Sequence, residues 1–447
     1  MAKRKGISRR RFVGDVTAAG LSFTIVPRHV LGRGYLAPSD KLNIGCIGGG
    51  GRAKDDIAGV SATENIYAIA DPDWDNAGES FAKFPQAKKY KDYREMLDKE
   101  KSLDAVVVAC PDHSHTPAAL MALRLGKHVY CEKPLCRTLG EVRALMKAAA
   151  ERPKLATQMG NQGHAGEGIR LIREWVEAGL IGTVREVHFW TDRPIWPQAI
   201  DRPLQEYYVP ATLDWNLWLG PAPERPYNPA YEPFNWRGWW DFGTGALGDM
   251  ACHIMDAAFW TLDLGSPTRV IAETTEQFKE TAPKSSRVEY HFAAKGSRAP
   301  VTCVWRDGSI YPPRPAEVPA GLPWPPSEDG GSYWIGDKGK LIAGTYGGSP
   351  QLLDPQAMAE VTAHPVPQKY PRVTSVYAEW INAAKGNGKT GSSFDGYAGP
   401  LTSMVLLGDL AVRMAGAIDV NPATGDVTTS GIPAEWVTPV YRGGWTM

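Results

Sequence analysis

The chain has 447 residues, which is long enough for two domains with a sizeable core. It carries 49 basic and 49 acidic residues, and this zero formal charge argues against nucleic-acid binding, which rests on a basic surface. Its 16 tryptophans fit core and interface packing, and a sugar-binding wall is the alternative use of the indole rings.

Residues 1–37 have the pattern of an export signal and linker. The stretch S-R-R-R-F at 8–12 carries twin arginines, and an apolar run from Val16 to Val26 ends at Pro27. That run is too short to span a bilayer as a stable helix, whereas a twin-arginine signal has this arrangement. A basic N-terminal arm is the alternative. The pattern predicts an exported, periplasmic protein that uses the twin-arginine export machinery.

Between residues 38 and 158 we expect strands and helices to alternate. Short, nearly continuous apolar runs are typical of buried parallel strands, and they occur at 42–47, 66–70, 104–109, 128–131 and 155–158. Helical stretches are expected between them at 54–60, 75–83, 93–98, 117–125 and 139–150. This alternation predicts a doubly wound parallel sheet of the α/β class.

The pattern changes in the second domain, which we place at 159–447. Polar and apolar residues alternate, as in half-solvated strands, at 184–191, 268–274, 286–293, 300–306, 333–336 and 340–343. Helices are expected at 166–178, 373–385 and 400–416, and a long loop rich in aromatic residues and proline fills 193–240. A mixed or antiparallel sheet with one covered face is therefore expected.

The six cysteines are interpreted as buried free thiols rather than disulfides, although an exported protein could pair them. Four of them lie within or at the ends of apolar strand-like runs, and no two have the spacing of a zinc site. They are Cys46, Cys110, Cys131, Cys136, Cys252 and Cys303.

The stretch I-G-G-G-G-R-A at 47–53 lies between a predicted strand and a predicted helix and fits the dinucleotide-binding pattern G-x-G-x-x-A. Gly48 permits the tight turn, Gly50 lets a pyrophosphate approach the backbone, and Ala53 lets helix and strand pack closely. Asp71 follows the second strand, where an acid accepts from the adenosine ribose and repels a 2′-phosphate. NAD is therefore expected as cofactor rather than NADP.

Three further motifs follow predicted strands or open a helix. In A-C-P-D-H-S-H at 109–115 the histidines and aspartate suggest a metal site, but no other ligand cluster accompanies them, so no metal is predicted. In V-Y-C-E-K-P-L at 129–135, Lys133 at a strand end either contacts a nicotinamide ribose and a substrate hydroxyl or forms a structural pair with Glu132.

The stretch G-A-L-G-D-M-A-C-H-I-M-D at 245–256 predicts a helix preceded by glycines. Asp249 and His253 are four residues apart and share one helical face, and Asp256 could share it too. A carboxylate beside an imidazole raises the pKa of the ring and orients it, which suits a general base acting on an alcohol. A capped helix with a hydrogen-bonded structural histidine is the alternative.

Together these motifs, with Y-K-D-Y-R at 90–94 and F-D-G-Y-A-G-P at 394–400, resemble the Gfo/Idh/MocA oxidoreductase family over nearly the whole chain after the signal. The resemblance implies an N-terminal Rossmann domain and a C-terminal α/β domain with a large open, mostly antiparallel sheet. That sheet often forms an oligomer interface in the family, so a homodimer or homotetramer is expected.

The resemblance also implies roles for individual residues. Lys133, Asp249 and His253 would be catalytic: His253 takes the hydroxyl proton, Lys133 polarises the oxygen and Asp249 positions it. Cofactor-binding residues would be Gly48, Gly50, Gly51, Arg52, Asp71, Pro111, His113, His115, Glu132 and Lys133. Candidates for the sugar pocket are Arg237, Trp239, Trp240 and Asp241.

The resemblance favours hydride transfer between a sugar or polyol and nicotinamide, either in a dehydrogenase or in a sugar–sugar oxidoreductase with tightly held NAD. The alternative is an NAD-dependent, redox-neutral glycoside hydrolase that oxidises C3 transiently and eliminates the aglycone. The Glu132-Lys133-Pro134 turn disfavours the branch of exported N-acetylgalactosaminidases, which lacks it. A non-catalytic cofactor-binding sensor is a third possibility, against which the intact Lys133, Asp249 and His253 argue.

Overall fold

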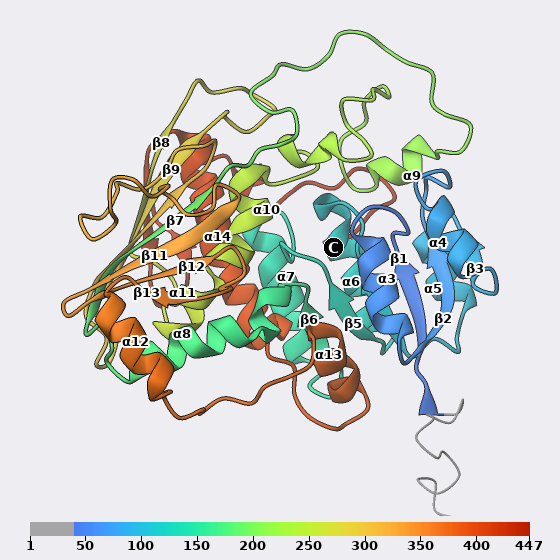
Figure 1. Ribbon diagram of the computed structural model, residues 1–447. Coiled ribbons are helices and arrows are strands. Elements are labelled where there is room, and N and C mark those ends of the chain that lie inside the picture. Colours follow the sequence, from blue (N-terminus) through green and yellow to red (C-terminus); the bar gives the residue numbers. More distant parts are fainter. Residues whose placement is uncertain (1–39) are drawn as a thin grey trace, which may run out of the picture. The chain divides into compact units, whose positions relative to one another are not determined.

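The computed structural model describes residues 40–447, and the fold below is that of residues 42–447 (Figure 1). The proposed twin-arginine signal lies outside the described residues. No helix within 40–447 has the length and apolar character needed to cross a membrane.

Six parallel strands form the first sheet, in the order β3-β2-β1-β4-β5-β6. They are β1 (Asn43–Ile47), β2 (Asn65–Ala70), β3 (Lys88–Tyr90), β4 (Ala105–Val108), β5 (His128–Cys131) and β6 (Thr157–Met159). The helices between them are α3 (Ala53–Ser61), α4 (Gly78–Lys83), α5 (Tyr93–Lys99), α6 (His115–Arg124) and α7 (Leu139–Ala150). The strand order reverses between β1 and β4, where such sheets open a crevice for ligands.

The expected Rossmann sheet is therefore confirmed, and β5 and α7 have the predicted bounds. Strand β3 was not predicted, because it has three residues and its two lysines are exposed. Helix α6 begins at His115, two residues earlier than predicted, and so brings the second histidine of the P-D-H-S-H stretch onto its first turn.

The second sheet has nine strands in the order β13-β12-β11-β7-β10-β9-β8-β14-β15, and only β7 and β10 pair in parallel. Its central strands are β7 (Val184–Thr191), β8 (Arg269–Thr274), β9 (Ser286–Phe292), β10 (Val301–Arg306) and β11 (Gly330–Gly336). The outer strands are β12 (Lys340–Gly344), β13 (Gln351–Leu352), β14 (Ala417–Asn421) and β15 (Asp426–Val427). This confirms the predicted, mostly antiparallel second sheet.

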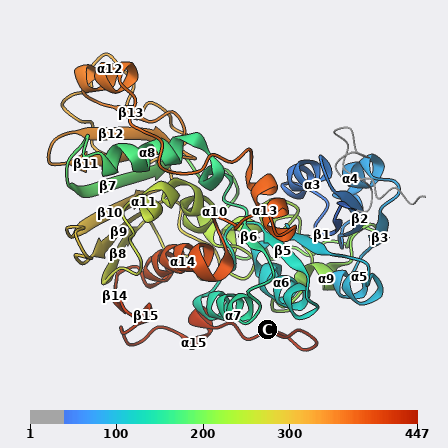
Figure 2. The same ribbon diagram turned by 90° about the horizontal axis from the view of Figure 1, so that it is seen from below.

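Helices cover one face of this sheet (Figures 1 and 2). Helix α14 (Gly399–Met414) packs on β8, β9 and β14, and α10 (Gly245–Ile254) contacts β7, β11 and α14. The other helices after β6 are α8 (Glu167–Glu177), α9 (Trp215–Leu219), α11 (Asp256–Thr261), α12 (Pro355–Ala363), α13 (Val376–Ala384) and α15 (Ala434–Val437). The loop predicted at 193–240 thus contains one short α-helix, α9.

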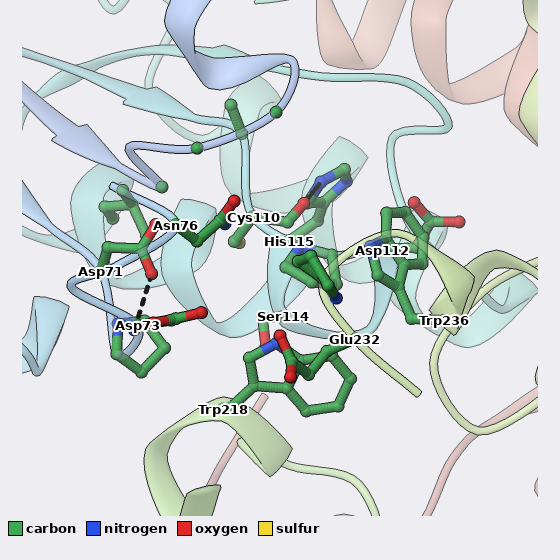
Figure 3. Close-up of a pocket in the computed structure, with 18 of the residues that line it drawn as sticks. Asp71, Asp73, Asn76, Cys110, Asp112, Ser114, His115, Trp218, Glu232 and Trp236 are labelled. Atoms are coloured by element: carbon green, nitrogen blue, oxygen red, sulfur yellow. Dashed lines mark hydrogen bonds between the residues drawn. The ribbon is translucent and has the colours of Figure 1, made fainter. Parts of the chain in front are cut away.

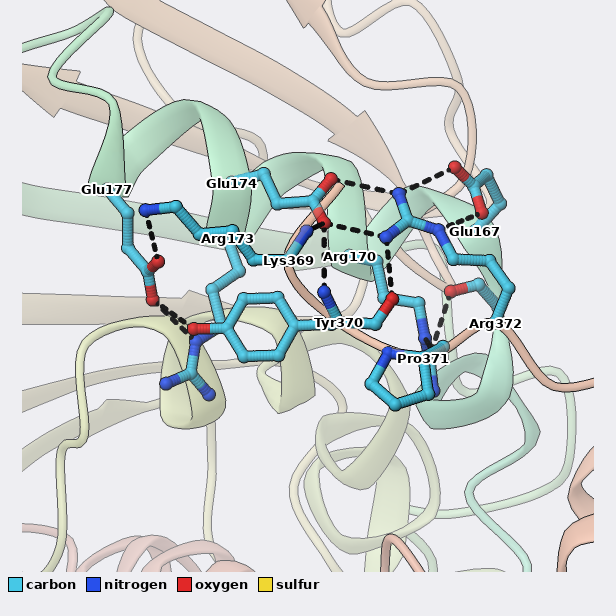
Figure 4. Close-up of polar contacts among 10 residues, drawn as sticks. Glu167, Arg170, Arg173, Glu174, Glu177, Lys369, Tyr370, Pro371 and Arg372 are labelled. Atoms are coloured by element: carbon cyan, nitrogen blue, oxygen red, sulfur yellow. Dashed lines mark hydrogen bonds and ion pairs between the residues drawn. The ribbon is translucent and has the colours of Figure 1, made fainter. Parts of the chain in front are cut away.

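Residues 369–385 connect helix α8 of the second domain with helix α3 beside the first sheet. Arg372 pairs with both Glu167 and Glu174 of α8, at 2.8 and 2.6 Å (Figure 4). The chain then enters α13, which packs on α3 of the first sheet, and Lys385 pairs with Glu64 at 2.5 Å. The domain boundaries at 37/38 and 158/159 stay predictions.

All six cysteines are free in the described structure, as predicted. Five are buried and Cys110 is partly buried.

Candidate functional site

A pocket of about 380 Å³ opens at the carboxyl ends of β1, β2, β4 and β5 (Figure 3). Its first wall comes from the glycine loop and the residues that follow β2, β4 and β5. Its second wall comes from α9, from residues 232–237 and from α10. The volume lies in the range of small-molecule sites.

The glycine loop has the geometry that a dinucleotide requires. Gly48 has a φ of +100°, and a Cβ there would lie 2.6 Å from the main-chain oxygen of Ala109. A Cβ on Gly50 would lie 2.2 Å from the amide nitrogen of Asn76. Gly51 also lines the pocket, and α3 begins two residues later, so the positive end of a helix dipole lies next to this space. The loop fits a bound pyrophosphate.

Asp71 closes the loop against β2. Its Oδ2 accepts from the N–H of Gly49 at 2.8 Å, and its Oδ1 accepts from the N–H of Asp73 at 2.9 Å. Burial raises the pKa of Asp71 to about 6, although both backbone donors oppose that rise. Asp73 and Asn76 line the pocket beside it (Figure 3), so two carboxyl groups stand where the adenosine ribose of NAD is expected.

Arg52 lines the pocket and is surrounded by carboxylates. Its guanidinium lies 3.1 Å from Asp55, 3.3 Å from Asp56 and 3.3 Å from Glu132. Tyr377 of α13 accepts a hydrogen bond from it at 2.7 Å. The structure thus joins two predicted cofactor residues, Arg52 and Glu132, in one ion-pair network.

The two histidines of the P-D-H-S-H stretch separate. His115 lines the pocket with Pro111, and its ring nitrogens lie 2.9 Å from the main-chain oxygen of Pro134 and 2.7 Å from that of Cys110. His113 does not line the pocket: its ring contacts the main-chain oxygens of Trp218 and Phe242, and burial lowers its pKa to about 3. His113 therefore supports the opposite wall.

Asp112, which was not among the predicted site residues, lines the pocket as well. The hydroxyl of Thr244 donates to its Oδ2 at 2.9 Å. Burial raises the pKa of Asp112 to about 7, and the nearby charge of Lys133 limits the rise. No group of three His, Cys, Asp or Glu side chains within the described residues is arranged to hold a metal ion.

Lys133 and Asp249 meet across the pocket. Lys133 Nζ lies 3.0 Å from Asp249 Oδ1 and 2.9 Å from the main-chain oxygen of Asp249. Arg237 Nε donates to the same Oδ1 at 3.2 Å. Burial alone would raise the pKa of Asp249, but Lys133 and Arg237 outweigh it and lower that pKa to about 2. Burial alone would lower the pKa of Lys133, yet Asp249 and Glu132 raise it. Both side chains are therefore charged.

His253 lies on α10 one turn after Asp249 but is not part of the pocket wall. It is buried, its Nδ1 has no hydrogen-bond partner in the described structure, and its ring packs edge-on against Tyr346 at 5.0 Å. Burial lowers the pKa of His253 well below its usual value, so the ring is neutral. Asp249 does raise this pKa, as expected, but burial and the charge of Lys133 outweigh its contribution.

Asp256 does not share the face of Asp249 and His253. Helix α10 ends at Ile254, and Asp256 begins α11. Its carboxylate accepts from Asn161 and lies against His164, both at 3.0 Å, and Tyr397 also donates to it. The sequence pattern missed the break between the two helices.

Of the four residues expected in the sugar pocket, the structure brings only Arg237 to it. Trp239 is fully buried and donates to the main-chain oxygen of Ala230 at 2.9 Å. Trp240 packs beneath Arg413, at 5.1 Å from the guanidinium to the ring centroid. Asp241 pairs with Arg225.

The pocket contains several residues that sequence reasoning did not select. They come from distant parts of the chain and include Lys91, Tyr93, Ser114, Trp218, Glu232, Phe234, Trp236 and Trp445. Trp218, Glu232 and Trp236 face the glycine-loop side across the cavity (Figure 3). Lys91, Tyr93 and Ser114 lie in the motifs Y-K-D-Y-R and P-D-H-S-H, whereas no local motif marks the other five.

Comparisons with known proteins agree with this geometry. Residues 42–160 match the Gfo/Idh/MocA domain described as "Oxidoreductase family, NAD-binding Rossmann fold", and residues 167–300 match "Oxidoreductase family, C-terminal alpha/beta domain". The chain carries both domains of the Gfo/Idh/MocA oxidoreductase family. This match confirms the expected cofactor class, NAD, whereas the preference over NADP remains a prediction from Asp71.

Curated relatives are similar over part of their length. Levoglucosan dehydrogenase of Pseudarthrobacter phenanthrenivorans is 25% identical over 243 residues, covering 52% of this chain and 54% of that protein. Inositol 2-dehydrogenase of Serratia proteamaculans is 31% identical over 150 residues, covering 33% of this chain and 44% of that protein. The chain thus spans about half the length of the curated relatives it matches.

Solved Gfo/Idh/MocA structures share the fold. WlbA dehydrogenase of Bordetella pertussis, solved with NADH and UDP-GlcNAcA, aligns with a TM-score of 0.61 at 18% identity, over 85% of this chain and 99% of that one. Levoglucosan dehydrogenase, solved with NADH and levoglucosan, aligns with a TM-score of 0.58 at 19% identity, over 85% and 99%.

Proposed function

We propose that this protein oxidises a secondary hydroxyl of a sugar or polyol, or reduces the corresponding ketone, with NAD as hydride carrier. The observation that carries the proposal is the Lys133–Asp249 pair, which stands in the same pocket as the glycine loop. When bound, NAD supplies a nicotinamide carbon that accepts or donates the hydride. The sugar or polyol class is supported by relatives that are levoglucosan and inositol dehydrogenases.

Lys133 would bind and polarise the reacting oxygen. A protonated lysine has three N–H donors. The main-chain oxygen and the Oδ1 of Asp249 accept two hydrogen bonds from Lys133. The third is available to a substrate oxygen, whose alkoxide character the ammonium would stabilise. Because Lys133 is held protonated, it does not itself accept the hydroxyl proton.

His253 would accept that proton. Its ring is neutral, and its buried Nδ1 has no hydrogen-bond partner among residues 40–447, so the ring has a free position for a hydrogen bond. A substrate hydroxyl or one intervening water would bridge His253 to the pocket, since the ring itself does not line it. Asp249, placed between Lys133 and Arg237, would fix the ammonium rather than the imidazole.

Arg237 and its aromatic neighbours would hold the substrate ring. The guanidinium lies 4.4 Å from the ring centroid of Trp236 and 4.6 Å from that of Phe234. This stacking presents Arg237 as a rigid donor to hydroxyl groups, beside apolar ring faces of the kind that sugars contact.

The first experiment is performed on protein purified without added cofactor. It is denatured, released nucleotide is identified by mass spectrometry, and the native protein is then screened on free sugars, polyols and aryl glycosides. NADH formed from a free sugar or polyol would support the proposal. Stoichiometric NAD with cleavage of an aryl glycoside and no net NADH would instead favour a redox-neutral hydrolase. NAD binding without turnover of any of these would indicate a sensor.

We also propose export by the twin-arginine route, on the strength of the S-R-R-R-F stretch at 8–12. Outside the cytoplasm no free NAD pool is available, so an exported enzyme would either retain its NAD and recycle it with a second substrate or catalyse a reaction that is redox-neutral overall. Replacing Arg9 and Arg10 by lysine should move the protein from the periplasmic to the cytoplasmic fraction. An unchanged distribution would reject the signal. The homo-oligomer stays a prediction, which light scattering of the purified protein tests.

A further inference from the structure

Trp445 lines the NAD pocket, although it lies nearly 400 residues from the glycine loop. It lines the pocket together with Lys91, Asp92 and Tyr93, which follow strand β3, the neighbour of β2, after which Asp71 lies. Its ring centroid is 6.1 Å from that of Tyr93. The two aromatic rings therefore share one wall of the pocket.

Arg94 stacks on the indole of Trp445. Its guanidinium lies 4.1 Å from the centroid of the Trp445 ring, and its Nη1 donates to the main-chain oxygen of Gly444 at 3.3 Å. Asp92 in turn fixes Arg94 through an ion pair at 2.7 Å. The orientation of Trp445 is thus set by contacts to α5.

Arg442 ties the same segment to the opposite wall. Its Nε donates to the main-chain oxygen of Gly220 at 2.5 Å, and its Nη1 donates to Asn216 Oδ1 at 2.7 Å. These acceptors belong to α9 and the residue after it, and Leu217 and Trp218 of α9 line the pocket. Residues 442–445 therefore bridge the two walls of the pocket, after a path from α15 past α7 (red in Figure 2).

We propose that Trp445 is an NAD-binding residue that covers the adenosine half of the cofactor, and that residues 442–445 act as a clasp that slows its release. The position beside Tyr93 and on the side of Asp71 assigns it to the adenosine half, because Asp71 is the expected ribose acceptor. A flat indole stacks on a purine, as aromatic side chains do on nucleic-acid bases. The inference concerns NAD binding only and stands whether or not the sugar chemistry is as proposed.

The test measures NADH binding by its fluorescence, after bound nucleotide is removed, for wild type and Trp445→Ala. We expect the Kd to rise about 10-fold, the change that about 1.4 kcal/mol of base stacking corresponds to. Trp436→Ala is the matched control: that indole also carries a stacked arginine, Arg413 at 4.0 Å, but lines another cavity. Its Kd should stay within twofold of wild type. An unchanged Kd for Trp445→Ala, or an equal rise in both variants, would overturn the proposal.

Binding of ADP-ribose, which lacks the nicotinamide, tests which half of the cofactor Trp445 contacts. Trp445→Ala should weaken the binding of ADP-ribose and of NADH by the same factor, and a loss of affinity confined to NADH would place Trp445 elsewhere.

The clasp is tested by stopped-flow displacement of NADH from Arg442→Gln, in which the indole is retained. A dissociation rate at least about fivefold faster is expected, and an unchanged rate would reject the clasp. Trp445→Phe, which keeps a ring, should restore most of the affinity and controls for folding.

Discussion

Lys133 Nζ donates to both the side chain and the main chain of Asp249, at 3.0 and 2.9 Å. The turn after β5 and the second turn of α10 are thereby joined by one ammonium group. The contact between these two sequence motifs, 116 residues apart, is what makes the pocket a candidate for hydride-transfer chemistry.

Replacing Lys133 by methionine should abolish turnover and spare cofactor binding. The variant keeps most of the side-chain volume and loses the charge that would polarise the substrate oxygen, so we expect kcat to fall by at least about 100-fold. The Kd of NADH, measured by fluorescence, should change by less than about threefold. A Lys133→Met enzyme at the wild-type rate would remove Lys133 from the mechanism.

His253→Gln tests the proposed base. General base catalysis contributes about 10²–10⁴-fold, so kcat should fall by that range while the Kd of NADH stays constant. His364→Gln is a suitable control, because His364 is exposed and directly follows α12. If the His253→Gln and His364→Gln enzymes turn over equally fast, the proton leaves by another group.

Asp71→Ser should relax the preference for NAD. The carboxylate that would repel a 2′-phosphate is lost, so the ratio of the NADP Kd to the NAD Kd should fall by at least about 10-fold. The variant also loses acceptors for the N–H groups of Gly49 and Asp73, and both Kd values can rise together. Only the ratio is diagnostic. Asp75→Ser, which changes an exposed carboxylate outside the pocket wall, should leave the ratio unchanged.

Arg372→Ala should destabilise the fold without affecting NADH binding. Glu174 would lose its main hydrogen-bond donor, at a cost of about 1–3 kcal/mol in the free energy of unfolding. Arg372, together with the backbone N–H groups of Lys369 and Tyr370, lowers the pKa of Glu174 from 4.5 to about 2, so these contacts stabilise fully above about pH 4.5. That contribution is lost as the pH falls towards 2.

Denaturant unfolding at pH 7 and pH 3 measures this effect. The difference in the free energy of unfolding between wild type and Arg372→Ala should be larger at pH 7 than at pH 3. Arg143→Ala removes an ion pair with Asp426 whose two side chains are about half exposed, and it should cost less than about 1 kcal/mol. If the difference in the free energy of unfolding between wild type and Arg372→Ala increases at low pH, the stabilisation does not come from the ionised Arg372–Glu174 pair.

The features that the sequence predicted well are local in the chain. Strand and helix periodicity located β5, α7 and β7, and the glycine spacing located the loop that Asp71 closes. The Lys133–Asp249 contact was expected from the family resemblance, since neither motif alone specifies it.

The features that were missed depend on distant contacts. Asp256 left the predicted helical face because α10 breaks after Ile254, within a run that reads as continuously helical. Trp239 and Trp240 closely follow the pocket residue Arg237 in the sequence. Their rings nevertheless pack elsewhere, against Ala230 and Arg413 respectively. Trp445 reaches the pocket through the contacts of Arg94 and Arg442 with its segment, which no spacing rule expresses.

The three carboxylates around Arg52 have a consequence for the way in which the cofactor is held. Asp55, Asp56 and Glu132 already compensate the guanidinium, so it brings no surplus positive charge to the mouth of the glycine loop. The phosphates of NAD would then be bound by neutral main-chain N–H donors and the start of α3 rather than by a counter-charge. Attraction of that kind acts at short range and is weakly screened by salt. Affinity for NAD should accordingly be nearly independent of ionic strength.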